Sequence, residues 1–224
     1  MSVGTLARTD AILLDLDGTL ADSRPGIVAC FKFMLKELGH DPSTAGDLTA
    51  LVGPPNAVSV RMLLSRYNDD RIDLGVTTYR AHYSEVALYD VKPFPGVAEM
   101  LAALQATGRP LCVATSKRRD FAERVVEFLG FEHVLPTVYG ALPGGGLDDK
   151  KDMIAELLRV EGYDPGGTIM VGDRYHDIEA AKANGLRSVG AVWGYGGAKE
   201  LREAGADRLA ASPADVVGEV SRAF

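Results

Sequence analysis

The chain has 224 residues, of which 46% are hydrophobic and 25% are charged, and its formal net charge at pH 7 is −7. This composition is typical of a soluble globular protein. The acidic balance argues against a nucleic-acid or anionic-membrane partner, because no basic field would draw the chain to phosphates. No apolar run approaches membrane-spanning length and no segment resembles a signal peptide, so we expect a cytoplasmic protein without a membrane partner. Composition leaves the oligomeric state open between monomer and homodimer.

The first predicted element is a buried strand at AILLDLD (11–17). From about Arg24 to Val91 the sequence shows helical patterns and no convincing strand, with candidate helices at 31–39, 58–68 and 77–90. The segment VKPFPGV (91–97) carries two prolines and indicates a stiff connection back to the rest of the chain. We therefore predict an α/β core domain of residues 1–22 plus 92–224 and a helical domain of residues 23–91 inserted into it.

After residue 97, short apolar runs alternate with stretches whose apolar residues recur at helical spacing. Each helical stretch ends in a glycine, a common helix stop. This alternation predicts a Rossmann-like, doubly wound parallel sheet with helices on both faces. Pro136 indicates that its strand lies at an edge of the sheet. The expected helices are 97–108, 119–130, 151–162 and 177–185, and the expected strands are 109–116, 134–140, 168–173 and 188–193.

Polar residues gather where the predicted strands end. In open parallel sheets, ligands bind beyond the carboxyl ends of the strands, at the point where the strand order reverses. These residues therefore have a physical reason to converge. They are Asp15 and Asp17 after the first strand, Thr115, Ser116 and Lys117 after the second, Asp173 and Asp177 after the fourth, and Lys150 and Lys151 at a helix start.

Such a set of residue types predicts a site for phosphoryl transfer. Several carboxylates in one pocket repel one another unless a cation neutralises them, and oxygen ligands suit a hard ion, for which we expect Mg²⁺. The Gly18–Thr19 turn can offer backbone N–H groups. The helix that starts near Arg119 presents its positive end behind Ser116, where a phosphate would bind. A lysine supplies a second positive charge.

The same clusters resemble the motifs of the haloacid dehalogenase superfamily, in its phosphoglycolate phosphatase-like branch with a helical cap. The resemblance covers nearly the whole chain, and its first and fourth motifs are the specific ones. VGPP (52–55), PFPGV (93–97) and VWGYGG (192–197) are also similar to stretches of this branch. The four motifs are DLDGTLADS (15–23), VATSK (113–117), the lysine of DDKKDMIAELL (148–158) and GDRYHDIEAA (172–181).

The resemblance implies a role for each motif residue. Asp15 would be the nucleophile that forms an aspartyl-phosphate, and Asp17 would be the general acid and then the base that activates water. Thr115 and the Ser116 N–H would bind the transferring phosphoryl group, and the helical insert would be a mobile cap that reads the leaving group. Lys150 would bridge Asp15 and the phosphoryl group, and Gly18, Thr19 and Lys117 would also contact that group. Mg²⁺ would be held by Asp15, the backbone carbonyl of Asp17, Asp173 and Asp177.

The substrate stays open at the level of sequence. The leading hypothesis is a Mg²⁺-dependent phosphatase of a small phosphorylated metabolite, nominally 2-phosphoglycolate, with a nucleoside 5'-monophosphate or pyrophosphate as alternatives. Other hypotheses are a sugar-phosphate mutase, a dehalogenase and a phospho-accepting signalling domain. Residues that could select the substrate are 52–56, Arg61, Arg80 and His82, and His176 borders the predicted pocket. Lys150 is favoured over Lys151 because its distance to the apolar helix matches the family better.

Overall fold

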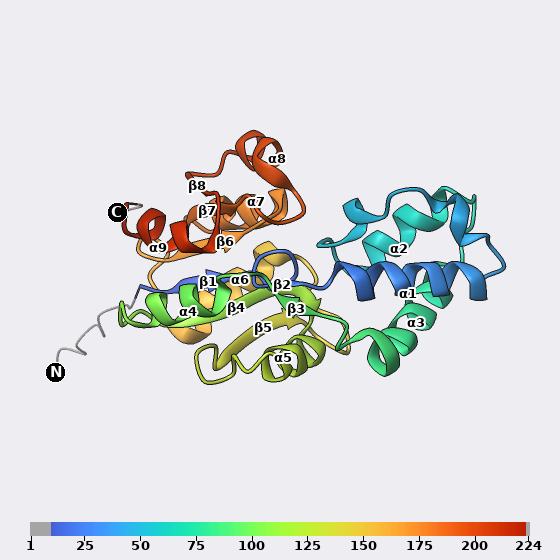
Figure 1. Cartoon of the computed structure of the whole chain (residues 1–224), viewed down its shortest axis with the longest axis horizontal. Coiled ribbons are helices and arrows are strands. Elements are labelled where there is room, and N and C mark those ends of the chain that lie inside the picture. The colour runs from blue at the N-terminus through green and yellow to red at the C-terminus, as the bar shows by residue number, and fades with distance from the viewer. Residues whose placement is uncertain (1–9, 223–224) are drawn as a thin grey trace.

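The structure, a computed structural model, describes residues 10–222. Its centre is a six-stranded sheet in the order β5-β4-β1-β6-β7-β8, with every neighbouring pair parallel. The expected doubly wound α/β fold is confirmed (Figure 1). The strands are β1 (Ile12–Leu14), β4 (Leu111–Arg118), β5 (Thr137–Ala141), β6 (Ile169–Gly172), β7 (Arg187–Ala191) and β8 (Arg208–Ala210).

Strand β1 lies in the middle of the sheet, between β4 and β6. Leu14 pairs with Val113 of β4 on one side and with Val171 of β6 on the other, so β1 and β6 end nearly level. Strand β4 continues to Arg118, so Thr115, Ser116 and Lys117 lie within this strand and not after it, where the sequence predicts them. The chain builds from β1 through β4 to β5 and then crosses to β6 on the other side of β1. The strand order therefore reverses at β1, which is where parallel sheets bind ligands.

The two faces of the sheet are covered by different helices. Ile12 and Leu14 pack in one hydrophobic cluster with α4 (Val97–Gln105), α5 (Arg119–Phe128) and α9 (Pro213–Arg222). Leu13 packs in a second cluster with α6 (Lys150–Glu161) and α7 (Tyr175–Ala183). This alternation follows from the two-residue period of a strand, which sends successive side chains to opposite faces.

Turn chemistry ends the helices as expected. Gly108, Gly130, Gly162 and Gly185, which follow the four predicted helices, all have φ between 72° and 75°. Glycine adopts this left-handed conformation without the steric cost that a side chain would bring. Strand β5, which Pro136 precedes, lies at an edge of the sheet, as the proline predicts.

A helical unit, defined here as residues 24–87, lies beyond the carboxyl end of β1 (Figure 1). Helix α3 packs on both α1 and α2, and it continues into a π-helical turn. A two-stranded antiparallel ribbon of β2 (Ala21–Asp22) and β3 (Lys92–Pro93) connects the unit to the sheet. The unit consists of α1 (Arg24–Glu37), η1 (Pro42–Ala45), η2 (Thr49–Leu51), α2 (Asn56–Ser65), α3 (Ile72–His82) and η3 (Tyr83–Ala87).

Several elements were absent from the sequence prediction. The strands β2 and β3 have two residues each and β8 has three, which is too short to produce an alternating pattern. Helix α8 (Gly197–Ala204) and α9 were also missed. In addition, β1 ends at Leu14 and not at residue 17, because the chain turns away from the sheet just after Asp15.

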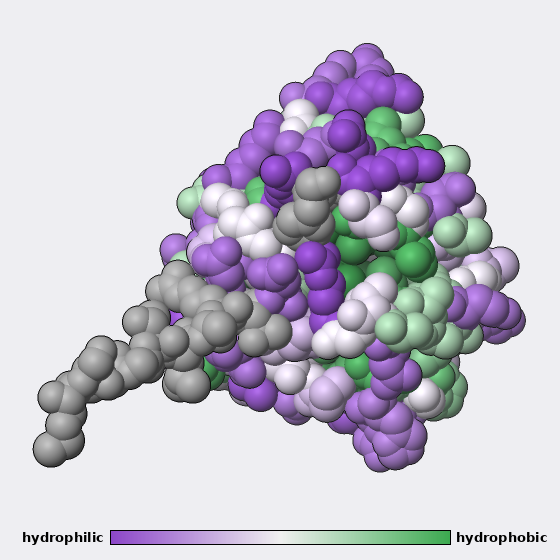
Figure 2. Space-filling view, turned by 90° about the vertical axis from the view of Figure 1, so that its left-hand side faces the viewer, coloured by the Kyte–Doolittle hydropathy of each residue, from purple (hydrophilic) through white to green (hydrophobic). Residues whose placement is uncertain are grey.

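The end of the molecule that carries both chain termini shows a mostly hydrophilic surface around a smaller hydrophobic area (Figure 2). Within residues 10–222, no helix combines the length and the apolar character needed to cross a membrane.

Close packing in the helical unit gives a test of the fold. A methyl group on Gly75 of α3 would lie 2.8 Å from Cγ1 of Val60, a stiff β-branched side chain, and 3.1 Å from Cδ1 of Leu64. We predict that Gly75→Ala lowers the free energy of unfolding by about 1–3 kcal/mol. At the exposed Gly218 of α9, where a methyl group meets nothing within 4 Å, Gly218→Ala should raise it by up to about 1 kcal/mol. Urea unfolding of both variants checks this, and equal stabilisation by both would contradict the packing.

Candidate active site

Asp15 follows β1 directly and begins the site. Its backbone N–H donates to the carbonyl of Val171 (2.9 Å), so the sheet pairing extends one residue beyond the strand. The chain then turns, with the Gly18 N–H donating to the Ala21 carbonyl (2.9 Å). Gly18 has φ of 98°, and a Cβ there would lie 2.3 Å from Oδ2 of Asp173. Only glycine allows the turn to approach this carboxylate so closely.

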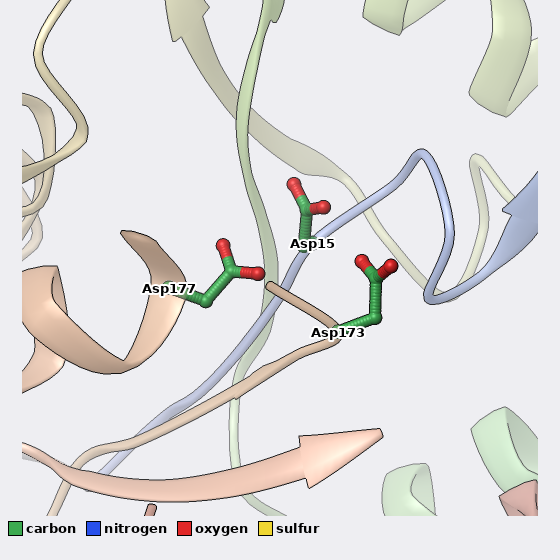
Figure 3. A group of neighbouring side chains, drawn as sticks. All are labelled: Asp15, Asp173 and Asp177. Carbon is green, nitrogen blue, oxygen red and sulfur yellow. The ribbon is translucent and has the colours of Figure 1, made fainter. Parts of the chain in front are cut away.

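Three buried carboxylates meet at this edge of the sheet. Asp15 comes from the end of β1, Asp173 from the loop after β6 and Asp177 from the first turn of α7 (Figure 3). One oxygen of each lies within 4.8 Å of the others, and the three residues are at most 4% exposed. The structure therefore brings together three of the four predicted metal-binding residues.

The proximity of these acids makes ionisation costly. Burial, with help from Asp177 and Asp17, raises the pKa of Asp15 to about 6 despite the opposing effect of Lys150. Burial and the charges of Asp15 and Asp177 raise the pKa of Asp173 well above its ordinary value. Like charges in a desolvated space favour the protonated form. A cation at this point would reverse that preference.

Lys150 supplies one positive charge to the cluster. Its Nζ lies 2.8 Å from Oδ1 of Asp15 and 2.5 Å from Oδ1 of Asp177. Burial alone would lower the pKa of Lys150, but these two carboxylates outweigh it and raise the pKa. Burial alone would likewise raise the pKa of Asp177, but the charge and the hydrogen bond of Lys150 outweigh it and lower the pKa. The adjacent Lys151 is exposed, so the structure places Lys150 in the cluster and Lys151 outside it.

A loop that follows β7 holds Asp173 in place. The backbone N–H of Tyr195 donates to Oδ2 of Asp173 (2.7 Å), and the hydroxyl of Thr19 donates to its Oδ1 (3.2 Å). The indole N–H of Trp193 donates to the carbonyl of Thr19 (3.0 Å). Sequence analysis missed that this loop orients an acid of the site. The side chain of Thr19 contacts Asp173 and does not line the cavity described below.

The carboxylate of Asp17 lies outside the three-acid cluster. Both of its oxygens are 2.6 Å from Nζ of Lys117, and Oδ1 also accepts a hydrogen bond from the Ser23 hydroxyl (2.5 Å). Lys117, predicted as a phosphate ligand, is thus paired with Asp17 in this structure. Sequence analysis did not single out Ser23, whose only signal was its place at the end of the first motif.

The second motif contributes two hydroxyl groups. Thr115 lies near the end of β4 and is 2% exposed, and its Oγ1 accepts a hydrogen bond from the Lys117 N–H (3.3 Å). The Oγ of Ser116 is buried without a hydrogen-bond partner. Helix α5 begins three residues later, at Arg119. The positive end of a helix therefore follows these hydroxyls, as predicted.

A cavity of about 740 Å³ opens between the sheet edge and the helical unit. The sheet side contributes Asp15, Asp17 and Lys150 with residues 115–118, and the helical unit contributes residues 51–59 together with the side chains of α1, α3 and η3 that face it. Of the predicted substrate-selecting residues, 52–56 and Arg80 line the cavity. Arg61 is exposed elsewhere, and the ring of His82 stacks on Phe33 with centroids 3.8 Å apart. His176 lines the cavity, as predicted.

The donor set fits Mg²⁺. The cluster contains three carboxylates and one buried lysine, which pairs with Asp15 and Asp177, so carboxylates outnumber cations. The possible ligand atoms are all oxygen. Mg²⁺ is bound through carboxylates of this kind, together with water and substrate phosphate.

Comparison with known proteins agrees with this geometry. The sequence pattern of the family described as haloacid dehalogenase-like hydrolase matches residues 12–191. The chain is 36% identical to a 5'-nucleotidase of Pseudomonas aeruginosa over 85% of this chain and 86% of that protein. It is 33% identical to a phosphoglycolate phosphatase of Neisseria meningitidis, over 85% of this chain and 83% of that protein.

Two further matches extend the comparison. The chain is 37% identical to the tyrosine-protein kinase PtkA of Mycobacterium tuberculosis over 83% of this chain, but it spans only 62% of that protein. The crystal structure of a predicted phosphatase from Clostridium acetobutylicum superposes with a TM-score of 0.87 at 28% identity, covering 96% of this chain and all of that one.

The chain therefore belongs to the haloacid dehalogenase-like hydrolase family, as its motifs suggest. Within that family it is a phosphoric monoester hydrolase.

Proton competition gives a test of the acid cluster. Because the pKa of Asp15 is raised to about 6, protons compete with a cation at a pH where an ordinary aspartate is fully ionised. We predict that Mg²⁺ affinity falls as the pH is lowered from 8 to 5, and by at least about tenfold per pH unit below pH 6, because protons on Asp15 and Asp173 compete with the ion. Calorimetric titration at pH 5, 6, 7 and 8 measures this. An affinity unchanged between pH 8 and pH 5 would contradict the burial and coupling of these acids.

Proposed function

We propose that this enzyme is a Mg²⁺-dependent phosphatase that hydrolyses a small phosphate monoester through an aspartyl-phosphate on Asp15. One observation carries the proposal. The carboxylate of Asp15 lies at the floor of the cavity, 2.8 Å from Nζ of Lys150, and Asp17 lines the same cavity two residues further on. A nucleophile, a charge that orients it and a second carboxylate thus share one enclosed space.

The first step uses Asp15 and Asp17 together. A carboxylate oxygen of Asp15 attacks phosphorus, the bond from phosphorus to the leaving oxygen breaks, and Asp17 donates a proton to that oxygen. Lys150 binds Oδ1 of Asp15, which leaves Oδ2 without a hydrogen bond from residues 10–222. Lys150 thereby orients the nucleophile while the other oxygen faces the substrate.

The second step reverses the role of Asp17. Its carboxylate takes a proton from water, the water oxygen attacks phosphorus, and the bond to Asp15 breaks to release phosphate. Splitting one displacement into two lets the same carboxylate serve as acid and then as base. Lys117 and Ser23, both hydrogen-bonded to Asp17, keep its carboxylate directed at the cavity.

Asp15, Asp173, Asp177 and the backbone carbonyl of Asp17 are proposed to hold Mg²⁺. When bound, the ion supplies positive charge that keeps the acids ionised and offsets the charge of the phosphoryl group. Thr115 and Ser116 bind that group from the second half of β4. The ammonium group of Lys117 contacts both the phosphoryl group and the carboxylate of Asp17. Contacts of Gly18 and Thr19 with the phosphoryl group stay a prediction, because both residues serve the turn here.

The helical unit is proposed to act as a cap that reads the leaving group, in a domain bounded by residues 23 and 91. Its side of the cavity includes the 52–56 loop and Arg80. A volume of about 740 Å³ lies within the range of roughly 300–1,000 Å³ for sites that hold drug-sized ligands. The two-carbon leaving group of 2-phosphoglycolate, the nominal substrate, would fill little of it. This observation favours a nucleoside 5'-monophosphate as the second candidate.

Phosphate release across a panel of esters tests the function. The panel contains 2-phosphoglycolate, nucleoside 5'-monophosphates, sugar phosphates, pyrophosphate and an aryl phosphate, each with and without Mg²⁺. We predict Mg²⁺-dependent release that Asp15→Asn lowers by at least about 10⁴-fold without loss of stability, because the substitution relieves carboxylate crowding. Asp152→Asn, an exposed change on α6, is the matched control. Normal turnover by Asp15→Asn would refute the nucleophile.

Asp17→Asn separates proton transfer from metal binding. We predict a loss of about 10²- to 10⁴-fold in kcat, because the variant cannot exchange a proton with the leaving oxygen or with water. Mg²⁺ affinity should be retained, because the proposed ligand is the backbone carbonyl. Calorimetry on Asp17→Asn and Asp173→Asn measures this directly. Equal losses of Mg²⁺ affinity in the two variants would show that the Asp17 carboxylate is a metal ligand instead.

A further inference from the structure

Unpaired polar atoms gather at the cavity. Among residues 10–222, five buried side-chain nitrogen and oxygen atoms lack a hydrogen-bond partner, and four of them belong to cavity-lining residues. They are Oδ1 of Asn56, Oγ of Ser116, and Nδ1 and Nε2 of His176. Buried polar groups in proteins are nearly always paired, so a concentration of exceptions in one cavity points to a ligand that supplies the missing partners.

Ser116 belongs with the phosphoryl group, but the other two residues do not. Asn56 is the first residue of α2 in the helical unit, and His176 is the second residue of α7 on the sheet side. Both residues line the cavity, Asn56 from the helical unit and His176 from the sheet side. Neither has a role in the two chemical steps.

The 52–56 loop packs directly on His176. A Cβ built on Gly53 would lie 3.1 Å from Cε1 of His176 and 3.2 Å from Cγ of Arg174, and Gly53 has φ of 113°. The guanidinium of Arg174 donates to the carbonyl of Val52 and, through Nε, to Oε1 of Glu200 (2.8 Å). Arg174 thus holds the 52–56 loop, which ends at Asn56, against the side of the cavity that carries His176.

The unpaired atoms define the chemistry of their partner. Oδ1 of Asn56 is an acceptor, and an imidazole presents at least one N–H donor. The missing partner must therefore donate a hydrogen bond to Asn56 and accept one from His176. A carboxylate accepts hydrogen bonds and donates none, whereas a hydroxyl group does both. The carboxylate of 2-phosphoglycolate cannot satisfy this pair, but the hydroxyls of a sugar can.

We propose that Asn56 and His176 form a specificity subsite that hydrogen-bonds hydroxyl groups of the leaving group, so that the preferred substrate is the phosphate ester of a polyhydroxylated compound. The subsite rests on the proposed phosphatase function and deepens it. The shared chemistry is a ring with vicinal hydroxyls, carried either by a free sugar phosphate or by the ribose of a nucleotide.

The test compares esters that differ only in their hydroxyls. One arm is a nucleoside 5'-monophosphate against its 2',3'-dideoxy counterpart, and the other is ribose 5-phosphate against tetrahydrofurfuryl phosphate. We expect the wild-type enzyme to prefer the hydroxylated member by about 10- to 100-fold in kcat/KM, because a site built to bind hydroxyls rejects analogues that lack them. The arm with the higher kcat/KM identifies the source of the sugar.

The variants locate that preference. Asn56→Ala and His176→Phe should each lower the ratio of the two kcat/KM values toward one, whatever their effect on the absolute rates. His82→Phe is the matched control, because His82 stacks on Phe33 outside the cavity, and its ratio should equal that of the wild type.

Three results overturn the subsite: no wild-type preference for hydroxyls, a preference for 2-phosphoglycolate over every hydroxylated ester, or a ratio unchanged in both variants. Failure of the phosphatase function itself looks different. In that case no ester, including the aryl phosphate that has no such hydroxyls, shows release that depends on Asp15.

Discussion

The repulsion among three buried carboxylates is the constraint on which the site depends. Asp15, Asp173 and Asp177 present oxygens within 4.8 Å of one another, and a single buried lysine lies against two of them. Lys150 supplies one positive charge to this cluster, and in the proposed function a cation supplies more. The excess of negative charge that disfavours ionisation of Asp15 would attract Mg²⁺, and the ion would in turn keep Asp15 ionised for attack on phosphorus.

The surrounding backbone is shaped to hold these acids. A Cβ at Gly18 or Gly194 would fall within 2.3 Å of the Asp173 side chain, and one at Gly172 would fall 2.3 Å from the carboxyl carbon of Asp177. Main chain therefore packs where side chains would not fit. The loop that orients Asp173 also reaches the ribbon below the helical unit, since the Tyr195 hydroxyl donates to Asp22 (2.9 Å) and accepts from the Ser23 N–H (3.0 Å). One loop thus links the three-acid cluster to the base of the helical unit.

Sequence alone predicted the parallel sheet and the convergence of the motif residues, because both follow from local patterns. The spacing of apolar residues predicts each strand and helix from its own segment of sequence. Acids that follow parallel strands come together because these strands end at the same edge of the sheet. Partners that depend on tertiary contact could not be predicted. No local signal pairs Lys117 with Asp17, a hundred residues apart, or brings Arg174 to the carbonyl of Val52. Short elements such as β2 and β8 were missed for another reason, since two or three residues carry no period.

Trapping the phosphorylated enzyme tests the central claim most directly. Asp17→Asn lacks the base for the second step, so any aspartyl-phosphate should accumulate in it. The variant is mixed with Mg²⁺ and the aryl phosphate of the panel, whose phenolate leaves without a donated proton, so that the first step does not need Asp17. It is then quenched and reduced with borohydride, which converts an aspartyl-phosphate to homoserine. The account predicts homoserine at position 15 by peptide mass spectrometry, with none at Asp173 or Asp177. Phosphate release by the wild type without label at Asp15 in the variant, or label on another residue, would contradict it.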